Sequence, residues 1–172
     1  GRTTLMVRTA LQGTATRTSA QLAEDLESVG GAFGHAVGGD TFGWSVSAPS
    51  TVLPAALAIL ADVVQAPAFD AAMLETERRV ALAALAQLRD DMHRQPLRLA
   101  QHRAFGEHPY ARPSLGTEAG LAAVDPAALR RWHERLVREG DGVIVVVADM
   151  APDEVAALVR GAFRSLAWHA AA

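Results

Sequence analysis

The sequence predicts an α+β domain in which a mainly antiparallel sheet is covered by helices. Three observations predict this class: most of the chain reads as amphipathic helices, two alternating runs flank a glycine-rich turn, and a run of five β-branched residues occurs late in the chain. No repeat of about 20–50 residues is visible. A length of 172 residues suits one domain, so we expect residues 1–172 to form a single domain.

The clearest helix start is the segment from Thr18 to Gln21. A threonine followed three residues later by glutamine is a capping box, in which each side chain accepts a hydrogen bond from a backbone N–H group of the first turn. Leu22 and Leu26 follow at helical spacing, and the glycine pair that begins at Gly30 ends the helix.

A β-hairpin is predicted next. In residues 42–48, Phe42, Trp44 and Val46 alternate with glycine and serine, while Gly38 and Gly39 separate this run from residues 33–37. Alternation on both sides of a glycine-rich turn is typical of two antiparallel strands.

The remaining helices follow from apolar spacing and from proline. Pro67 ends one helix, Pro96 breaks a longer one, and Asp125 with Pro126 forms an N-cap followed by proline in the first turn. The predicted helical ranges are residues 50–65, 70–94, 97–105, 126–137 and 153–166.

Residues 143–147 are all β-branched, which is typical of a strand buried on both faces. We expect this strand to join the hairpin in one sheet, with the helix of residues 70–94 over one face. On that expectation, replacing Val145 by Ala would cost about 1–3 kcal/mol.

Composition excludes several classes of function. The chain has no cysteine, so disulfides, thiolate zinc sites and cysteine nucleophiles are absent. Its net charge of −3 argues against non-specific nucleic-acid binding, and we expect no nucleic-acid partner. No apolar run reaches the ~18–20 residues of a membrane helix, and no signal peptide is visible in the first residues, so we expect a soluble chain without a membrane span.

Spacing alone supplies no complete catalytic constellation. No two histidines lie three or four residues apart, so no helical pair can bind one metal ion. His102 and His108 have a spacing with no favoured metal geometry, whereas His35 and Asp40 flank the hairpin turn and could meet across it. An unrelated hydrolase that uses His35 and Asp40 therefore stays open as a minor alternative.

Several blocks of sequence, taken together and in order, resemble the insulinase-like zinc peptidases (family M16), the group that includes pitrilysin and mitochondrial processing peptidase. One block holds Gly13 and Thr14, and the valine-rich run ends at Asp149. The resemblance spans nearly the whole chain; its blocks are residues 11–14, 17–24, 26–31, 61–64, 67–69, 105–113, 115–117 and 143–149.

In active members of that family, a helix with His-x-x-Glu-His precedes the Gly-Thr block; its histidines bind zinc and its glutamate activates water. Aligning that helix places Thr4 and Arg8 at the histidine positions and Val7 at the glutamate position. The third ligand, a glutamate in a later helix, aligns with Ala83 or Ala84. The resemblance therefore implies no catalytic residue and no metal ligand in this chain.

The resemblance implies a non-catalytic, chamber-completing domain, part of a larger chain, that holds an extended peptide. Zinc is expected in a catalytic M16 domain or subunit that carries His-x-x-Glu-His. Members also use an arginine and a tyrosine seven residues apart to contact substrate; Arg103 and Tyr110 match that spacing without its context, so we expect a coincidence. The alternative is a structural assembly subunit derived from the same fold.

Overall fold

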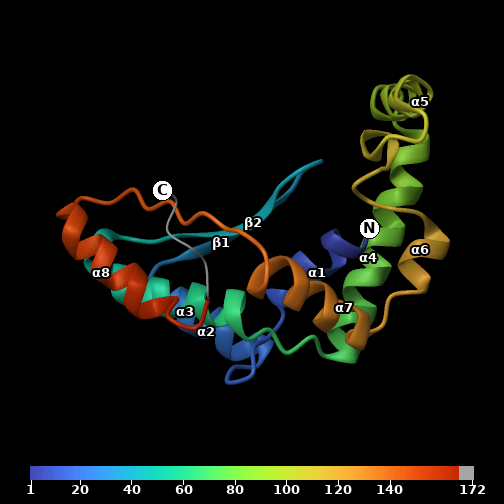
Figure 1. Cartoon of the computed structure of the whole chain (residues 1–172). Coiled ribbons are helices and arrows are strands. Elements are labelled where there is room, and N and C mark those ends of the chain that lie inside the picture. Colours follow the sequence, from blue (N-terminus) through green and yellow to red (C-terminus); the bar gives the residue numbers. More distant parts are fainter. Residues whose placement is uncertain (167–172) are drawn as a thin grey trace.

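The structure is a computed structural model that describes residues 1–166. Its strands are β1 (Ala32–Val37) and β2 (Phe42–Ser47), and its short turns are η1 (Ser50–Val52), η2 (Pro109–Ala111) and the π-helical η3 (Glu134–Arg138). The α-helices are α1 (Arg2–Ala10), α2 (Ser19–Ser28), α3 (Leu53–Gln65), α4 (Ala71–Asp90), α5 (Arg94–Phe105), α6 (Glu118–Ala122), α7 (Pro126–His133) and α8 (Pro152–Ala162) (Figure 1). The α+β class is confirmed.

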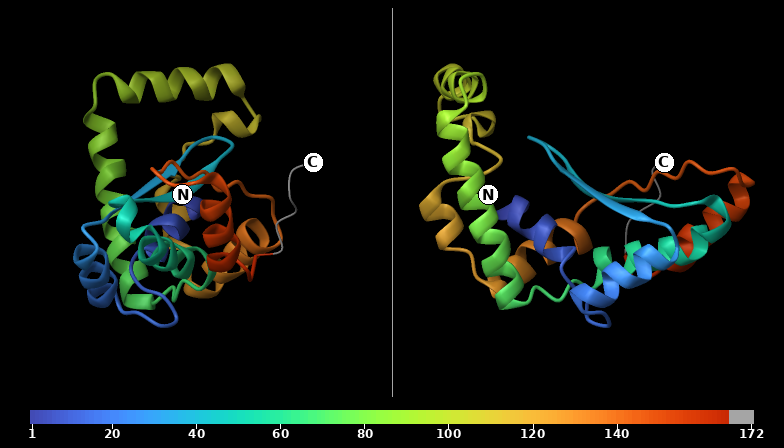
Figure 2. Two further views of the ribbon diagram at one scale, coloured as in Figure 1. Left: turned by 90° about the vertical axis from the view of Figure 1, so that its left-hand side faces the viewer. Right: turned by 180° about the vertical axis from the view of Figure 1, so that it is seen from behind.

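The molecule has a base and an arm. In the base, α1 contacts α4, α6, α7 and both strands. From there α4 rises out of the base, and α5 crosses its far end (Figures 1 and 2). We call residues 92–111, which contain α5 and η2, the arm. Among the described residues no helix is long and apolar enough to cross a bilayer.

The core lies around α1. Leu5, Met6 and Val7 are fully buried there, because α4, α7 and the hairpin all pack against this helix. Phe69 and Leu129 are also inaccessible to solvent and extend the same cluster toward α4 and α7. A helix that is buried on all sides is the central element of a small domain.

Polar caps set the ends of several helices. The Thr18–Gln21 capping box is confirmed: each side chain accepts a hydrogen bond from the backbone N–H group of the other residue. Asp125 accepts a hydrogen bond from the backbone N–H of Ala128 and starts α7 as expected. These caps satisfy N–H groups that the first helical turn leaves free.

The helix of residues 70–94 ends earlier than predicted. α4 stops at Asp90, and the Asp91 carboxylate accepts hydrogen bonds from the backbone N–H groups of His93 and Arg94, which start α5. Pro96 lies within the first turn of α5, where its missing N–H group costs nothing. The long helix is therefore broken at Asp91, whose side chain caps the start of α5. Pro96 fits into the first turn of α5 and does not cause the break.

The hairpin is confirmed, with Ala32 opposite Ser47 and Val37 opposite Phe42. It is attached to the base by Trp44, whose indole Nε1–H donates a 2.8 Å hydrogen bond to the carbonyl oxygen of Val7. The helices that pack on the hairpin are chiefly α1, α2 and α3. The prediction that residues 70–94 cover the sheet is wrong, because α1 lies between α4 and the hairpin.

The predicted strand at residues 143–147 is not part of the sheet. Within residues 1–166 the sheet has two strands, β1 and β2, and residues 141–148 form neither helix nor strand. Val143, Val145 and Val147 are 85%, 79% and 96% exposed. The sequence shows that a segment favours the extended state, but it does not show whether another strand is in place to pair with it.

Candidate functional site

The three positions aligned with the peptidase zinc helix lie on α1, at the spacing that puts them on one side of a helix. Thr4 is buried, and its hydroxyl donates a 2.7 Å hydrogen bond to the carbonyl oxygen of Ser114. Val7 is fully buried, and its carbonyl oxygen accepts the hydrogen bond from Trp44. Both residues thus connect α1 to neighbouring segments.

Arg8 forms an ion pair with Glu77 of α4, with 2.8 Å between Arg8 Nε and Glu77 Oε2. The side chains are 23% and 8% exposed, so the carboxylate is the more deeply buried partner. Its other oxygen, Oε1, accepts a 2.8 Å hydrogen bond from Gln12 Nε2. A buried carboxylate needs such partners, because removal from water strongly disfavours an unpaired charge.

The structure distinguishes the two alanines proposed for the third ligand position. Glu77, Ala81 and Ala84 follow each other at four- and three-residue steps, so they share one side of α4. Ala83 is exposed, whereas Ala81 is buried and Ala84 half-buried. Ala84 therefore takes the position that faces the base, and its methyl group offers no electron pair to a metal.

The residues present do not fit a catalytic zinc ion. Such an ion needs about three protein ligands, usually imidazole or carboxylate groups. This site supplies one carboxylate, Glu77, which is already paired with the guanidinium group of Arg8. In the described part of the chain no group of three or more His, Asp or Glu side chains is arranged to hold a metal.

Sequence reasoning missed Glu77. The signal that could have found it is its place two helical turns before Ala84, since residues seven apart in a helix lie on the same side. Once Arg8 stands at a ligand position, an acidic residue on the facing side of α4 is the partner that charge balance requires. The Arg8–Glu77 pair is the main polar contact across the aligned site.

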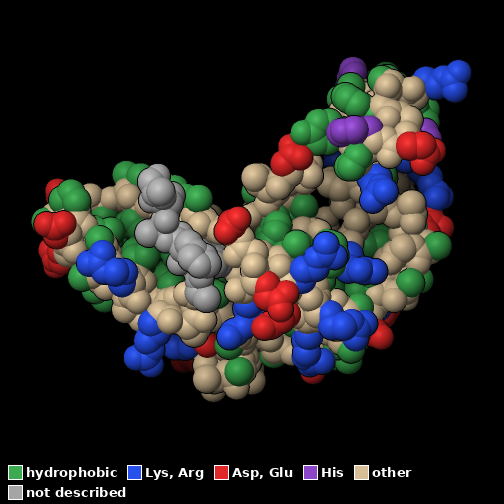
Figure 3. All heavy atoms as spheres, viewed as in Figure 1, with side chains coloured by type: hydrophobic (Ala, Val, Ile, Leu, Met, Phe, Trp, Pro, Cys, Tyr) green, Lys and Arg blue, Asp and Glu red, His purple; other side chains and the backbone are tan. Residues whose placement is uncertain are grey.

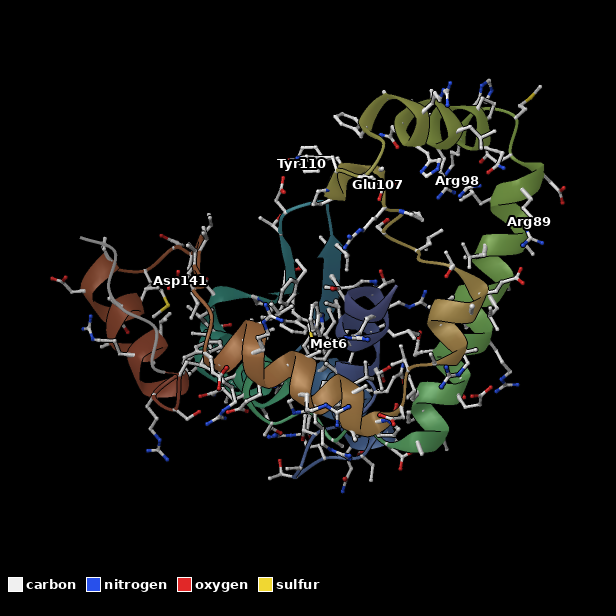
Figure 4. All side chains as sticks on the ribbon, turned by 45° about the vertical axis from the view of Figure 1, so that its right-hand side comes forward. Met6, Arg89, Arg98, Glu107, Tyr110 and Asp141 are labelled. Atoms are coloured by element: carbon white, nitrogen blue, oxygen red, sulfur yellow. The ribbon has the colours of Figure 1, made fainter. Side chains whose placement is uncertain are left out.

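The structure does not bring His35 and Asp40 together by any contact that it records among residues 1–166. His35 lies opposite Trp44 in the hairpin, whereas the Asp40 carboxylate accepts a 2.8 Å hydrogen bond from the Tyr110 hydroxyl. That hydrogen bond raises the pKa of Tyr110 above its ordinary value. Tyr110 therefore joins the arm to the hairpin turn, as Figure 4 shows from the arm side.

A second polar cluster holds the loop after α1 on α3. Asp62 Oδ2 accepts hydrogen bonds from the hydroxyls of Thr14 and Thr16 and from Arg17 Nη1, at 2.6, 2.8 and 2.6 Å. Burial by itself raises the pKa of Asp62, but these three donors lower it by more. The net pKa of Asp62 therefore lies below its ordinary value. Arg17 also pairs with Asp25 of α2 at 2.7 Å. The cluster is a structural connection between α1, α2 and α3.

Two surface hollows lie away from the aligned site. One, of about 470 Å³, lies between α3 and α8 and is mostly apolar; it includes Pro54 and Leu158. The other, of about 360 Å³, lies in the angle between α4, α5 and the start of α6, and Arg98 and Thr117 contribute to it. Neither contains Thr4, Val7 or Arg8.

Comparison with known proteins identifies the relatives of this chain. The family model described as insulinase (peptidase family M16) matches residues 1–118. An uncharacterized zinc protease of Mycobacterium leprae is 29% identical over 154 residues, which are 90% of this chain and 35% of that protein. The chain thus spans about a third of the length of this curated relative.

Solved structures share the fold. A peptidase M16 inactive domain from Pseudomonas fluorescens matches with a TM-score of 0.87 at 23% identity, over 100% of this chain and 42% of that one. The first half of the periplasmic protease PqqL from Escherichia coli matches with a TM-score of 0.80 at 21% identity, over 100% of this chain and 38% of that one. At these identities the likeness establishes the fold.

Proposed function

The chain belongs to the insulinase family of peptidases (family M16), and on that premise we propose that it is a non-catalytic domain that completes a substrate chamber and holds peptide for a zinc-bearing partner domain. The partner, on the same chain or on another subunit, would carry the intact His-x-x-Glu-His helix. The observation that carries the proposal is the ion pair of Arg8 with Glu77.

This ion pair supports a non-catalytic role, because the positive charge of Arg8 lies where an active relative would hold its metal ion. A guanidinium group at the second histidine position repels a divalent cation, and it already neutralises the acidic residue that faces it. Thr4 and Val7 already have structural roles: the Thr4 hydroxyl donates a hydrogen bond to Ser114, and the Val7 side chain packs in the apolar core. Restoring a single ligand would leave the other groups missing.

The shape of the molecule supports the second part of the proposal. The space-filling view shows a face hollowed between the arm and the rest of the molecule, with hydrophobic side chains along it (Figure 3). An extended peptide can bind to such a concave apolar surface and to exposed backbone edges. Since the chain spans about a third of a curated relative, further domains would enclose this hollow.

Metal content tests the non-catalytic role directly. We expect the purified chain to retain no stoichiometric zinc after dialysis, as measured by atomic emission. The matched comparison is a rebuilt variant that carries Thr4→His, Val7→Glu, Arg8→His and Ala84→Glu together, alongside Arg8→His alone. One tightly bound zinc ion per wild-type chain, lost in Glu77→Gln, would overturn the proposal.

Activity tests the chamber role. The chain alone should cleave no peptide, with or without added zinc, whereas a catalytic M16 domain that carries the intact motif should cleave faster once the chain is added. Cleavage of a fluorogenic peptide by the mixture provides the measurement. An identical rate with and without the chain, over a range of chain concentrations, would contradict a chamber-completing and peptide-holding role.

A further inference from the structure

Helix α5 turns its polar side toward the rest of the molecule. Its half-buried residues are Gln95 and Arg98, whereas Leu97 and Leu99 are 60% and 53% exposed. A helix that packs on a domain normally turns its apolar side inward. The inward side of α5 therefore offers hydrogen-bonding groups, instead of apolar packing, to the space between α5 and its neighbours.

That space is the hollow of about 360 Å³ between α4, α5 and the start of α6. Leu85 and Leu88 of α4, which are half-buried and buried, give the hollow an apolar side, and Thr117 lines it from the start of α6. Its volume is at the lower end of the range of about 300–1,000 Å³ that small-molecule sites occupy. The hollow is therefore suited to one end of a chain and not to a folded segment.

The Arg98 guanidinium group is held in place but not neutralised. Its Nε donates a 3.1 Å hydrogen bond to Oε1 of Gln95, one turn earlier in α5. Within residues 1–166 no ion pair includes Arg98, and no acceptor is recorded for its two Nη groups. Figure 4 shows Arg98 on the side of α5 toward α4. Two free Nη groups form a planar fork that matches the two oxygens of a carboxylate.

Arg98 supplies the net charge of the hollow. Among the described residues, the other charged side chains that line it are Arg89 and Glu118, which form an ion pair and so cancel each other. One unpaired positive charge is balanced by one negative charge. A phosphate dianion would leave an excess negative charge near Glu118, so the charge balance favours a carboxylate.

The apolar side of the hollow indicates what the carboxylate is attached to. At the C-terminus of a peptide, the carboxylate and the last side chain branch from the same carbon atom, so one small hollow can hold both. A glutamate or aspartate side chain ends in its carboxylate and has no apolar group beside it to cover Leu85 and Leu88. A C-terminal residue with an apolar side chain therefore fits the lining better than an acidic side chain does.

We propose that the hollow between α4, α5 and α6 binds the C-terminal carboxylate of a peptide. Both Nη groups of Arg98 donate to the carboxylate, and the last side chain, an apolar one, packs on Leu85 and Leu88. This inference rests on the proposed function, because it takes peptide as the class of molecule that the chain holds. It adds the end by which the peptide is held and the kind of residue found there.

The experiment uses the whole chain and peptides of sequence Ser-Gly-Ser-Gly-Leu with fluorescein at the N-terminus. One peptide has a free C-terminal carboxylate, and its matched control has a C-terminal amide. Fluorescence anisotropy gives Kd, and an NMR titration shows which residues respond. We expect the carboxylate to bind about tenfold more tightly than the amide at low salt and to shift the signals of Leu88, Arg98 and Thr117. A third peptide, with serine as its last residue and a free carboxylate, should bind about fivefold less tightly than the first, because it covers less apolar surface.

Two variants of α5 make the test selective. Arg98→Gln should remove the preference for the carboxylate over the amide. Arg103→Gln removes the same charge from an exposed position of α5 outside the hollow, so it should leave the preference unchanged. The NMR spectrum of each variant checks that it keeps its fold.

Three results would each overturn the proposal: equal affinity for the carboxylate and the amide, an equal loss of preference in both variants, or displacement of the peptide by inorganic phosphate at the same concentration. The proposed function fails on a different measurement, namely when the chain leaves cleavage by a catalytic M16 domain unchanged. The two failures can therefore be told apart.

Discussion

Helices α1 and α5 show how differently two short helices of one chain are used. α1 buries six of its residues and contacts helices on two sides as well as the hairpin, whereas α5 buries none and exposes Leu97 and Leu99 to solvent. Both carry leucine and arginine, so composition does not separate them. The difference indicates that buried contacts in the base stabilise the fold. The arm and residues 141–149, which we call the periphery, mainly contribute exposed surface.

A pair of leucines should give the largest contrast between the base and the arm. Leu5→Ala removes a fully buried side chain of α1 and should lower the free energy of unfolding by about 2–5 kcal/mol, through lost burial and the cavity left behind. Leu97→Ala, the matched change in α5, should stay within about 0.5 kcal/mol. Urea denaturation measures both, and equal losses would remove the distinction between base and arm.

The ion pair at the aligned site comes next in size. Arg8→Met leaves the buried Glu77 carboxylate with Gln12 as its partner and should cost about 1–3 kcal/mol. Adding Glu77→Gln to that variant should recover part of the loss, because it removes the unpaired charge. A double-mutant cycle from denaturation curves gives the coupling; additive losses would show that Arg8 and Glu77 do not act as a pair.

His133 in α7 makes the base sensitive to acid. Burial lowers its pKa below the ordinary 6.5, even though Nε2 lies 2.8 Å from the carbonyl oxygen of Val64, so the folded chain holds the ring neutral. The unfolded chain then binds the extra proton, and stability should fall as the pH drops below about 6.5, by at most about 1.4 kcal/mol per pH unit for one proton.

Denaturation at a series of pH values from 7.5 downward measures this effect. The control is His133→Gln, which keeps a polar side chain but removes the titration, so it should flatten the slope in the range near and below the ordinary histidine value. A slope that is unchanged in the variant would assign the acid sensitivity to other groups.

The smallest effect is expected at Val145. Because this side chain is 79% exposed, Val145→Ala should change the free energy of unfolding by less than about 0.5 kcal/mol, in place of the 1–3 kcal/mol expected for a buried strand. Thermal denaturation of the chain alone checks it. A loss above about 1 kcal/mol would mean that the segment is packed in solution, and would move it from the periphery to the core.

Local signals predicted most of the fold. The capping box at Thr18, the N-cap at Asp125 and the glycine-rich turn at Gly38 each depend on neighbours a few residues away, so the sequence contains the whole interaction. The sequence predicts the end of α4 too late, because a proline is a more visible signal than the Asp91 side chain, which here starts the next helix. Pairing of residues 143–147 depends on a distant strand, which no local pattern shows.

The candidate site was predicted in the same uneven way. The resemblance to M16 peptidases located Thr4, Val7 and Arg8 on one helix, and the structure places them on α1 facing the base. It could not choose between Ala83 and Ala84, because that choice depends on which side of α4 meets α1. The sequence does not single out Glu77, because a lone glutamate in a helix is usually solvated, and only the packing of α4 on α1 buries it.

The hydrogen bond between Tyr110 and Asp40 has a consequence for motion. It joins the end of the arm to the tip of the hairpin, two elements that otherwise attach to the base at separate places. Fraying of the hairpin tip and swinging of the arm should therefore occur as one cooperative opening, with similar amide-exchange rates at residues 38–41 and 108–111. Tyr110→Phe would separate the two rates while leaving the base at its native protection.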